Sequence, residues 1–319
     1  MPYNYCSQRK GRENNLGSTE NRLLGALAVA AAATMWGTLG IFAKILYAQG
    51  VSFESLVAVR ASVGWLAVIG FLLATRGARA LRVERRDLAF LLPLGLVGIG
   101  AFYLLYFYTV RESTVGTAAI LLYSAPAFVV VLAWLFLREP LNAAKVFGLL
   151  LTVGGISLVV GAYDPANLEV STKIVLTGLL SGLTYGLYAI FGRPIAGHLS
   201  PPVILSYALA FGSALLVVAA LPTLDTLVGL PATSYLILLM LSVVHTTLAF
   251  ALYTFGIRHL GAGRAAIVAT IEPVVAGVLG ITLLGEELTV LKALGAVLVI
   301  SGAILAQLRA GKPARIDPA

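Results

Sequence analysis

The sequence has few of the residues on which soluble and metal-containing proteins depend. Only 11% of its 319 residues are charged, whereas soluble domains carry about 25%. One cysteine, Cys6, and three histidines far apart in the chain provide neither a disulfide framework nor a metal cluster. The chain also lacks a His-Glu-x-x-His sequence and a Gly-x-x-x-x-Gly-Lys loop. It therefore has neither the zinc-binding motif of metalloproteases nor the phosphate-binding loop of ATP-driven proteins. We expect no cofactor, no metal and no enzyme activity.

Long uncharged stretches fill most of the chain, and hydrophobic residues make up 59% of it. With flanking residues, these stretches reach the roughly 17–25 residues that a bilayer-spanning helix needs. They do not alternate as the strands of a membrane barrel do. The sequence therefore predicts an all-α membrane protein with ten transmembrane helices, at residues 23–46, 52–75, 88–109, 115–137, 142–162, 173–195, 201–222, 232–257, 264–285 and 289–308.

The net charge of +8 raises the question of a nucleic-acid partner. The basic residues form no clustered stripe and belong to no nucleic-acid-binding motif, so we expect no such partner. They gather in the two terminal tails and in the connection at 76–86, while the connection at 222–231 has none. Because basic loops stay on the cytoplasmic side, both termini are predicted to be cytoplasmic in a multi-pass protein of the cell inner membrane.

The chain also repeats itself at a fixed offset. When Pro126 is placed over Pro273, identical residues coincide: Gly116 with Gly263, Glu139 with Glu286, Lys145 with Lys292, Gly148 with Gly295 and Gly155 with Gly302. Each copy holds five predicted helices, an odd number, so the second copy enters the membrane from the opposite side. The sequence thus predicts two inverted five-helix repeats around a central cavity. Their predicted limits are 22–166 and 167–309, between cytoplasmic tails at 1–21 and 310–319.

Inverted repeats are typical of secondary transporters, in which two copies provide alternative gates around one site. Channels use them as well, and duplication is also a simple way to build a large bundle. The expected partners are a small-molecule substrate, the lipid bilayer and, where transport is coupled, protons. A membrane-embedded enzyme is the main rival class.

Several segments resemble a known family. They are Ile271-Glu-Pro-Val-Val-Ala, Leu284-Gly-Glu-Glu-Leu, the glycine-rich stretch from Gly295 to Gly302, Tyr123-Ser-Ala-Pro and Met35-Trp-Gly-Thr. In these segments the chain is similar to the EamA-type drug/metabolite transporters over about residues 22–309. The resemblance implies ten helices, a central cavity and export of amino acids or other small metabolites, with a likeness to bacterial aromatic amino-acid exporters. A passive facilitator and a multidrug exporter of the same superfamily are the alternatives.

Glu272 is the acid that breaks the symmetry of the repeat, because Ala125 occupies the matching position. A carboxylate inside a bilayer costs roughly 2.5–3.5 kcal/mol on insertion scales, so it needs a partner or a function. It is predicted either to bind a proton or a substrate amine, or to accept hydrogen bonds from groups left free where Pro273 interrupts the helix.

Aromatic residues deep inside the predicted helices are candidate substrate-binding groups: Trp36, Tyr103, Tyr106, Tyr185 and Tyr253. Rings from the two halves can stack on an organic cargo while hydroxyl groups orient it, although ordinary packing also places rings inside a bundle. His245 is a candidate proton relay, or a buried histidine that hydrogen-bonds a neighbouring threonine or a backbone carbonyl.

Other charged and small residues have simpler expected roles. Arg60 is expected to snorkel to the lipid headgroups rather than attract a carboxylate. Glu139 and Glu286 are expected to face the N-terminal ends of the predicted spans that follow them, at 142–162 and 289–308 respectively. The glycines at 148, 155, 295 and 302 suit close helix contact, either within the chain or between two copies.

Overall fold

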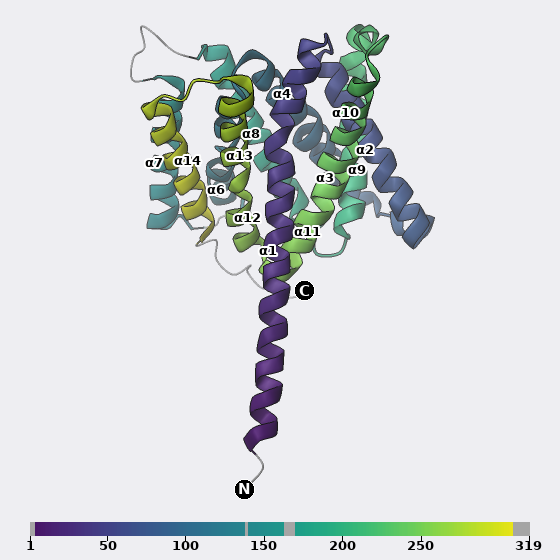
Figure 1. Cartoon of the computed structure of the whole chain (residues 1–319). Coiled ribbons are helices and arrows are strands. Elements are labelled where there is room, and N and C mark those ends of the chain that lie inside the picture. Colours follow the sequence, from purple (N-terminus) through teal and green to yellow (C-terminus); the bar gives the residue numbers. More distant parts are fainter. Residues whose placement is uncertain (1–3, 138–139, 163–169, 309–319) are drawn as a thin grey trace.

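The computed structural model describes residues 4–137, 140–162 and 170–308. All regular secondary structure in this part of the chain is helical. The α-helices are α1 (Asn4–Ala48), α2 (Phe53–Arg76), α3 (Arg85–Gly95), α4 (Phe102–Glu112), α5 (Val115–Leu122), α6 (Ala125–Leu137), α7 (Ala143–Val160), α8 (Thr172–Gly192), α9 (Pro201–Ala220), α10 (Ala232–Ser242), α11 (Ala249–Leu260), α12 (Ala262–Ala269), α13 (Ile271–Leu284) and α14 (Val290–Leu308). They form one bundle, from which the first part of α1 projects (Figure 1).

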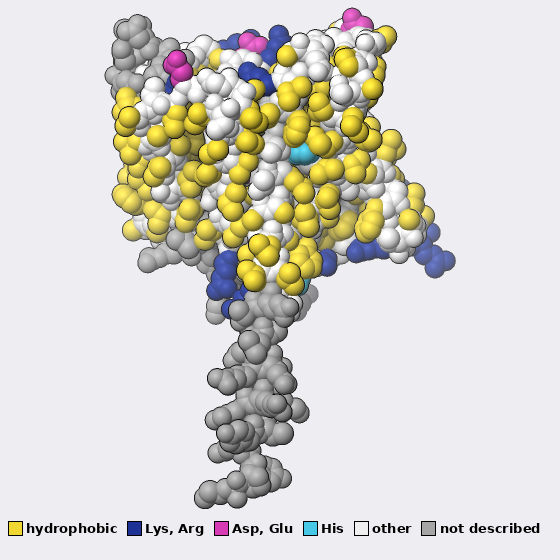
Figure 2. All heavy atoms as spheres, viewed as in Figure 1, with side chains coloured by type: hydrophobic (Ala, Val, Ile, Leu, Met, Phe, Trp, Pro, Cys, Tyr) yellow, Lys and Arg dark blue, Asp and Glu magenta, His cyan; other side chains and the backbone are white. Residues whose placement is uncertain are grey.

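The described chain contains ten helical stretches that are long and apolar enough to cross a membrane, as predicted. They are Asn21–Ala48, Phe53–Arg76, Arg85–Glu112, Val115–Phe136, Ala143–Val160, Thr172–Gly192, Pro201–Leu227, Ala232–Leu260, Gly263–Leu284 and Val290–Gln307. Large hydrophobic side chains cover the flank of the bundle, and charged side chains lie at its two ends (Figure 2). We call the end at which the first span begins, at Asn21, the N-terminal face, and the end at which it finishes, at Ala48, the distal face (Figure 1).

The internal repeat of the sequence reappears in the bounds of the helices. Two spans contain a π-helical turn, at Leu96–Ala101 and at Val243–Leu248, and both limits differ by 147 residues. The short helices α5 and α12 begin at residues 115 and 262, the same distance apart. Local geometry is therefore duplicated together with the sequence.

Proline explains why two spans are broken into paired helices. Pro126 and Pro273 follow the breaks between α5 and α6 and between α12 and α13. A proline has no N–H and its ring clashes with the preceding turn, so the helix ladder is interrupted there. Each break exposes polar backbone groups inside the bundle, where irregular backbone is tolerated only if it is buried in protein or lines a cavity.

Glycines bring α7 and α14 into close contact. A Cβ atom on Gly155 would lie 2.6 Å from the carbonyl oxygen of Gly295, and one on Gly148 would lie 2.9 Å from that of Gly302. The earlier glycine of one helix faces the later glycine of the other, so these two equivalent helices run antiparallel. The predicted glycine contact is therefore made within the chain.

The remaining contacts also follow the repeat. In the first half α1 packs against α11 and α13, and its equivalent α8 packs against α4 and α6. Gly37 of α1 lies against the carbonyl of Glu272, where an added Cβ would be 2.7 Å from the oxygen. The matching Gly186 of α8 lies beside the carbonyl of Ala125, at 3.4 Å. Both helix breaks are thereby held against a helix of the opposite half.

Candidate functional site

Glu272 lies in the first turn of α13 and forms its side-chain hydrogen bond with a residue of the other half. Its Oε2 atom is 3.2 Å from the hydroxyl of Tyr123, which is also 2.7 Å from the carbonyl oxygen of Ala269. The tyrosine has one hydroxyl proton to donate. When that proton is donated to Ala269, a protonated Glu272 can donate to the tyrosine oxygen, so this arrangement accommodates both the charged and the neutral carboxyl group.

The break at Pro273 frees one carbonyl, that of Ala269 four residues earlier, because proline cannot donate to it. Tyr123 fills this vacancy with its hydroxyl group. No main-chain N–H in the described part of the chain donates to the Glu272 carboxylate. Tyr123 therefore supplies the hydrogen-bond donor that Pro273 lacks. One carboxylate oxygen of Glu272 has no hydrogen-bond partner among the described residues.

Two of the predicted aromatic residues have free surface near this acid. Tyr185 is 40% exposed, although its ring packs 5.1 Å from that of Phe102. It lies within electrostatic reach of Tyr253 and Glu272, and both of those residues are half-buried. Tyr185 therefore combines exposed surface with a position near this acid.

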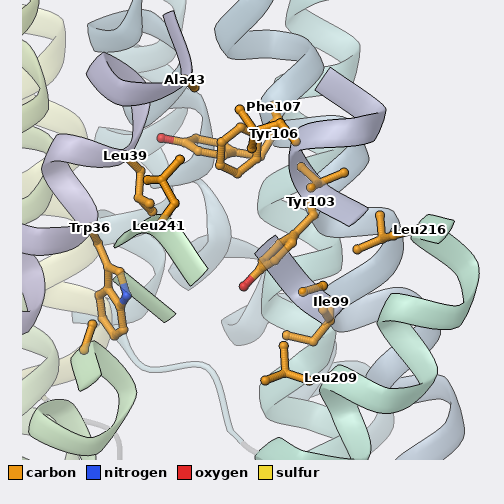
Figure 3. Close-up of a cluster of buried hydrophobic side chains, with 14 of the residues drawn as sticks. Trp36, Leu39, Ala43, Ile99, Tyr103, Tyr106, Phe107, Leu209, Leu216 and Leu241 are labelled. Carbon is orange, nitrogen blue, oxygen red and sulfur yellow. The ribbon is translucent and has the colours of Figure 1, made fainter. Parts of the chain in front are cut away.

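The other three predicted aromatic residues are buried. Trp36 donates its indole N–H to the carbonyl of His245, 3.1 Å away, and packs against the ring of Tyr253 at 5.2 Å. Tyr103 and Tyr106 are 2% and 4% exposed. Their hydroxyl groups both point to the side on which Trp36 lies (Figure 3). Tyr103 and Tyr106 both pack against Phe102, whose ring also contacts Tyr185.

His245 lies in the π-helical turn between α10 and α11 and has both ring nitrogens near protein atoms. Its Nε2 atom is 2.9 Å from the hydroxyl of Thr38, and its Nδ1 atom is 3.3 Å from the carbonyl oxygen of Met240. The ring is 4% exposed and packs against Phe42. The backbone-carbonyl partner was expected, whereas the threonine partner comes from α1 instead of the neighbouring sequence.

Arg60 does not snorkel to the headgroups, so that expectation was wrong. Its side chain is buried, only 3% exposed, and its Nε atom donates to the hydroxyl of Thr246 at 3.0 Å. The guanidinium carbon lies 4.4 Å from the ring centroid of Tyr103. The sequence places Arg60 two turns into α2, but it does not reveal that this side of the helix faces α4 and the π-helical turn before α11.

Glu286 also contradicts its expected placement. Its carboxylate accepts hydrogen bonds from the main-chain N–H groups of Val115, at 2.5 Å, and Gly116, at 3.1 Å. These groups begin α5 and not the last helix, so the acid joins the second half of the chain to the first. The matching Glu139 lies outside the described residues. This contact lies at the distal face, where α13 and α14 connect (Figure 1).

Two concave surfaces beside α2 are separate from this constellation. One lies between α2 and α9, and the other is bounded by α2, α10 and Leu227; neither contains any of the predicted site residues. Their lining residues are Ser62, Trp65, Leu66, Ala210, Ser213, Ala214 and Val217 in the first, and Val59, Val63, Leu227, Tyr235, Leu238 and Leu239 in the second.

Comparison with known proteins then decides the family. The sequence profile of the EamA-like transporter family matches residues 23–161 and again residues 172–308. The chain belongs to this family. The two EamA matches fall on the two copies of the internal repeat, and the resemblance drawn from the Glu272-Pro273 segment is confirmed. The protein is a multi-pass membrane transporter.

Relatives of this EamA-like protein are transporters from archaea and bacteria. An uncharacterized transporter of Archaeoglobus fulgidus is 30% identical over 286 residues, which cover 88% of this chain and 96% of that protein. An uncharacterized inner membrane transporter of Salmonella typhimurium is 27% identical, with coverage of 94% and 99%. A probable terminal-alkyne amino-acid exporter of Streptantibioticus cattleyicolor is 25% identical, with coverage of 70% and 74%. One solved crystal structure shares the fold, with a TM-score of 0.61, 20% identity and coverage of 89% of this chain and 96% of that one.

Proposed function

We propose that this EamA-like protein is a secondary transporter that exports amino acids or related small metabolites across the inner membrane by alternating access. The proposal rests mainly on the surroundings of Glu272. Its carboxyl group lies near accessible tyrosine rings and has one oxygen without a hydrogen-bond partner in the described chain. An intramembrane acid in such a setting is a functional group by default. The relative described as a probable amino-acid exporter supports the substrate class.

Alternating access rests on the two halves being inverted copies. The antiparallel contact of α7 with α14, and the matching contacts of α1 and α8 with the opposite half, support this arrangement. In such a construction each half can adopt the packing of the other, which moves the opening from one face to the other. The contact of Glu286 with α5 is the closure at the distal face in the present conformation.

The two termini are assigned to the cytoplasm on the basis of charge. In Figure 2, the visible Asp and Glu side chains lie at the distal face, and the arginine-rich connection at 76–86 joins two spans at the N-terminal face. Because basic residues remain in the cytoplasm, the N-terminal face is the cytoplasmic one. The closed distal face then faces outward, and export begins with cargo that enters from the cytoplasm.

We assign Tyr185 and Tyr253 to direct contact with the cargo, because both have accessible surface near Glu272. Trp36, Tyr103 and Tyr106 support these rings from behind. The accessible faces of Tyr185 and Tyr253 suit an organic side chain, and tyrosine hydroxyl groups can orient its polar part.

Glu272 is assigned to proton or amine binding, because its hydrogen bond with Tyr123 tolerates both protonation states. His245 is the second candidate for a proton pathway. Its contact with Thr38 links it to α1, two residues from Trp36.

The experiment that tests this function uses protein reconstituted in liposomes and a panel of labelled amino acids. We expect at least one amino acid to move faster than in protein-free liposomes, and an imposed pH gradient to accelerate it. Glu272→Gln should insert normally and lose this acceleration, whereas the exposed-acid control Glu287→Gln should keep it. Movement that ignores the pH gradient would identify a passive facilitator instead, and a fully active Glu272→Gln protein would remove the coupling role.

A further inference from the structure

We propose that Arg60 binds the carboxylate group of the cargo on the side of the site opposite Glu272. This inference rests on the proposed transport of amino acids and specifies how their two charges are recognised. It assigns the cargo to the zwitterions and other carboxylates, as distinct from purely cationic or neutral drugs.

The Arg60 side chain has donors that no described residue uses. A guanidinium group carries five N–H donors in a planar fork. Thr246 accepts from Nε, and the guanidinium carbon lies 4.4 Å from the ring centroid of Tyr103 and 5.3 Å from that of Phe107. The two terminal nitrogens have no hydrogen-bond partner in the described chain, and neither is fully buried. Both nitrogens therefore keep some accessible surface and donors for a ligand, although Arg60 as a whole is 3% exposed.

Arg60 has no ion-pair partner among the described residues. No carboxylate of the described residues lies within 4.0 Å of an Arg60 nitrogen. A buried charge without a partner is costly. The contact with Tyr103 offsets part of this cost through the face of the ring. The edge of the guanidinium, where an anion binds with two parallel hydrogen bonds, is left for a ligand.

Arg60 and Glu272 belong to one set of interacting residues. Packing around Trp36 connects the two residues: Thr246, which accepts from Arg60, follows His245, whose carbonyl accepts the Trp36 indole N–H, and Gly37 lies against the carbonyl of Glu272. Arg60 and Glu272 form no ion pair, although the two charges interact electrostatically. Tyr106 interacts electrostatically with both Arg60 and Glu272. Tyr47 and His245 also lie within electrostatic reach of Arg60, and neither supplies a permanent negative charge. An amino acid placed between Arg60 and Glu272 would present its carboxylate to the first and its ammonium group to the second.

Binding of three ligands that share one phenyl ring tests this inference. L-Phenylalanine carries both charges, 3-phenylpropionate lacks the ammonium group and L-phenylalaninamide lacks the carboxylate. Their affinities are measured by equilibrium dialysis against the full chain in lipid nanodiscs. We expect Arg60→Gln to weaken phenylalanine and 3-phenylpropionate by about ten- to a hundredfold and to leave the amide unchanged. The control Arg258→Gln, at an exposed position, should change none of the three.

Retained binding of the amide shows that the variant is folded. Arg60→Lys provides a second test, because it keeps the charge but loses the fork. It should weaken the two carboxylates less than Arg60→Gln does and again spare the amide. Equal losses for all three ligands, carboxylate affinities that do not change, or no binding of the carboxylates by the unaltered protein would each overturn the inference. Failure of the proposed function is a separate result, in which liposomes with the unaltered protein move none of the labelled amino acids.

Discussion

The carboxylate of Glu286 caps the first turn of α5 by accepting the N–H of Val115 at 2.5 Å. The free N–H groups at the start of a helix and its dipole both favour an anion at this position. On the other side of the same junction, the Lys44 amine donates to the carbonyls of Arg111 and Ser113, at 3.1 and 2.8 Å, at the end of α4. The junction between α4 and α5 is thus held from both sides by charges that complement the two helix ends. In the proposed transport cycle this clamp closes the distal face.

Glu286→Gln should loosen the clamp. The amide keeps the shape of the side chain but removes the charge-assisted hydrogen bonds, which are worth about 1.5–3 kcal/mol each. A cysteine at Ala43, which is fully buried beside Lys44, reports the opening in a Cys6→Ser background. We expect a membrane-impermeant maleimide added from the distal side to label it about tenfold faster in the Glu286→Gln protein.

The neighbouring acid provides the control for this measurement. Glu287 is exposed and has no hydrogen bond among the described residues, so Glu287→Gln should leave the labelling rate unchanged. Equal acceleration by both substitutions would mean that general surface charge, and not the cap on α5, controls access.

Tyr123→Phe should destabilise the protein, because the carbonyl of Ala269 would lose the donor that replaces the proline N–H. A buried acceptor left without a partner costs about 1–3 kcal/mol. Tyr185→Phe is the matched control: it removes the same atom from a hydroxyl with no described hydrogen bond. We expect a lower midpoint of thermal denaturation in detergent for Tyr123→Phe alone; equal midpoints would contradict the role of Tyr123 at the break.

Gly155→Ala should weaken the contact between α7 and α14. The added methyl group would lie 2.6 Å from a backbone carbonyl oxygen, which cannot move aside as a side chain can. The adjacent Gly154 has open space at its Cβ position, so Gly154→Ala should be neutral or stabilising by up to about 1 kcal/mol. The midpoints of thermal denaturation of the two variants are compared, and we expect a lower midpoint for Gly155→Ala alone. A Gly155→Ala protein as stable as the unaltered one would show that α7 and α14 are not in close contact at this position.

Trp36→Phe should separate the two roles of this residue. The phenyl ring keeps the aromatic surface but loses the hydrogen bond to the carbonyl of His245, at a cost of about 0.5–1.5 kcal/mol. Trp65, half-buried on the flank of α2 and without a described hydrogen bond, gives the control Trp65→Phe. We expect lower thermal stability and unchanged cargo affinity for Trp36→Phe. A fall in affinity at unchanged stability would instead place the indole N–H on the cargo.

Features that depend on distance along the chain were predictable from the sequence. The ten spans follow from the lengths of the uncharged stretches, and the repeat at an offset of 147 residues is visible in its identical residues. The break before Pro273 follows from the chemistry of proline. The resemblance carried by the Glu272-Pro273 segment led to the correct family.

Features that depend on which side of a helix faces a neighbour were not predictable. Arg60 lies where a snorkelling residue could lie, and only the packing of α2 against α4 shows that it points inward. Tyr123 is separated from Glu272 by 149 residues, and no periodic pattern connects them. Glu286 lies next to the last helix in sequence but caps α5, because the folding of the bundle brings the two halves together at the distal face.

Counterflow in liposomes tests alternating access most directly. Vesicles that contain the protein are loaded with a high concentration of unlabelled cargo, and the uptake of trace labelled cargo is followed without any ion gradient. A carrier whose single site opens to one face at a time must return with cargo bound, so internal cargo should produce a transient accumulation of label above equilibrium. Uptake that only approaches equilibrium, at a rate independent of internal cargo, would contradict the account.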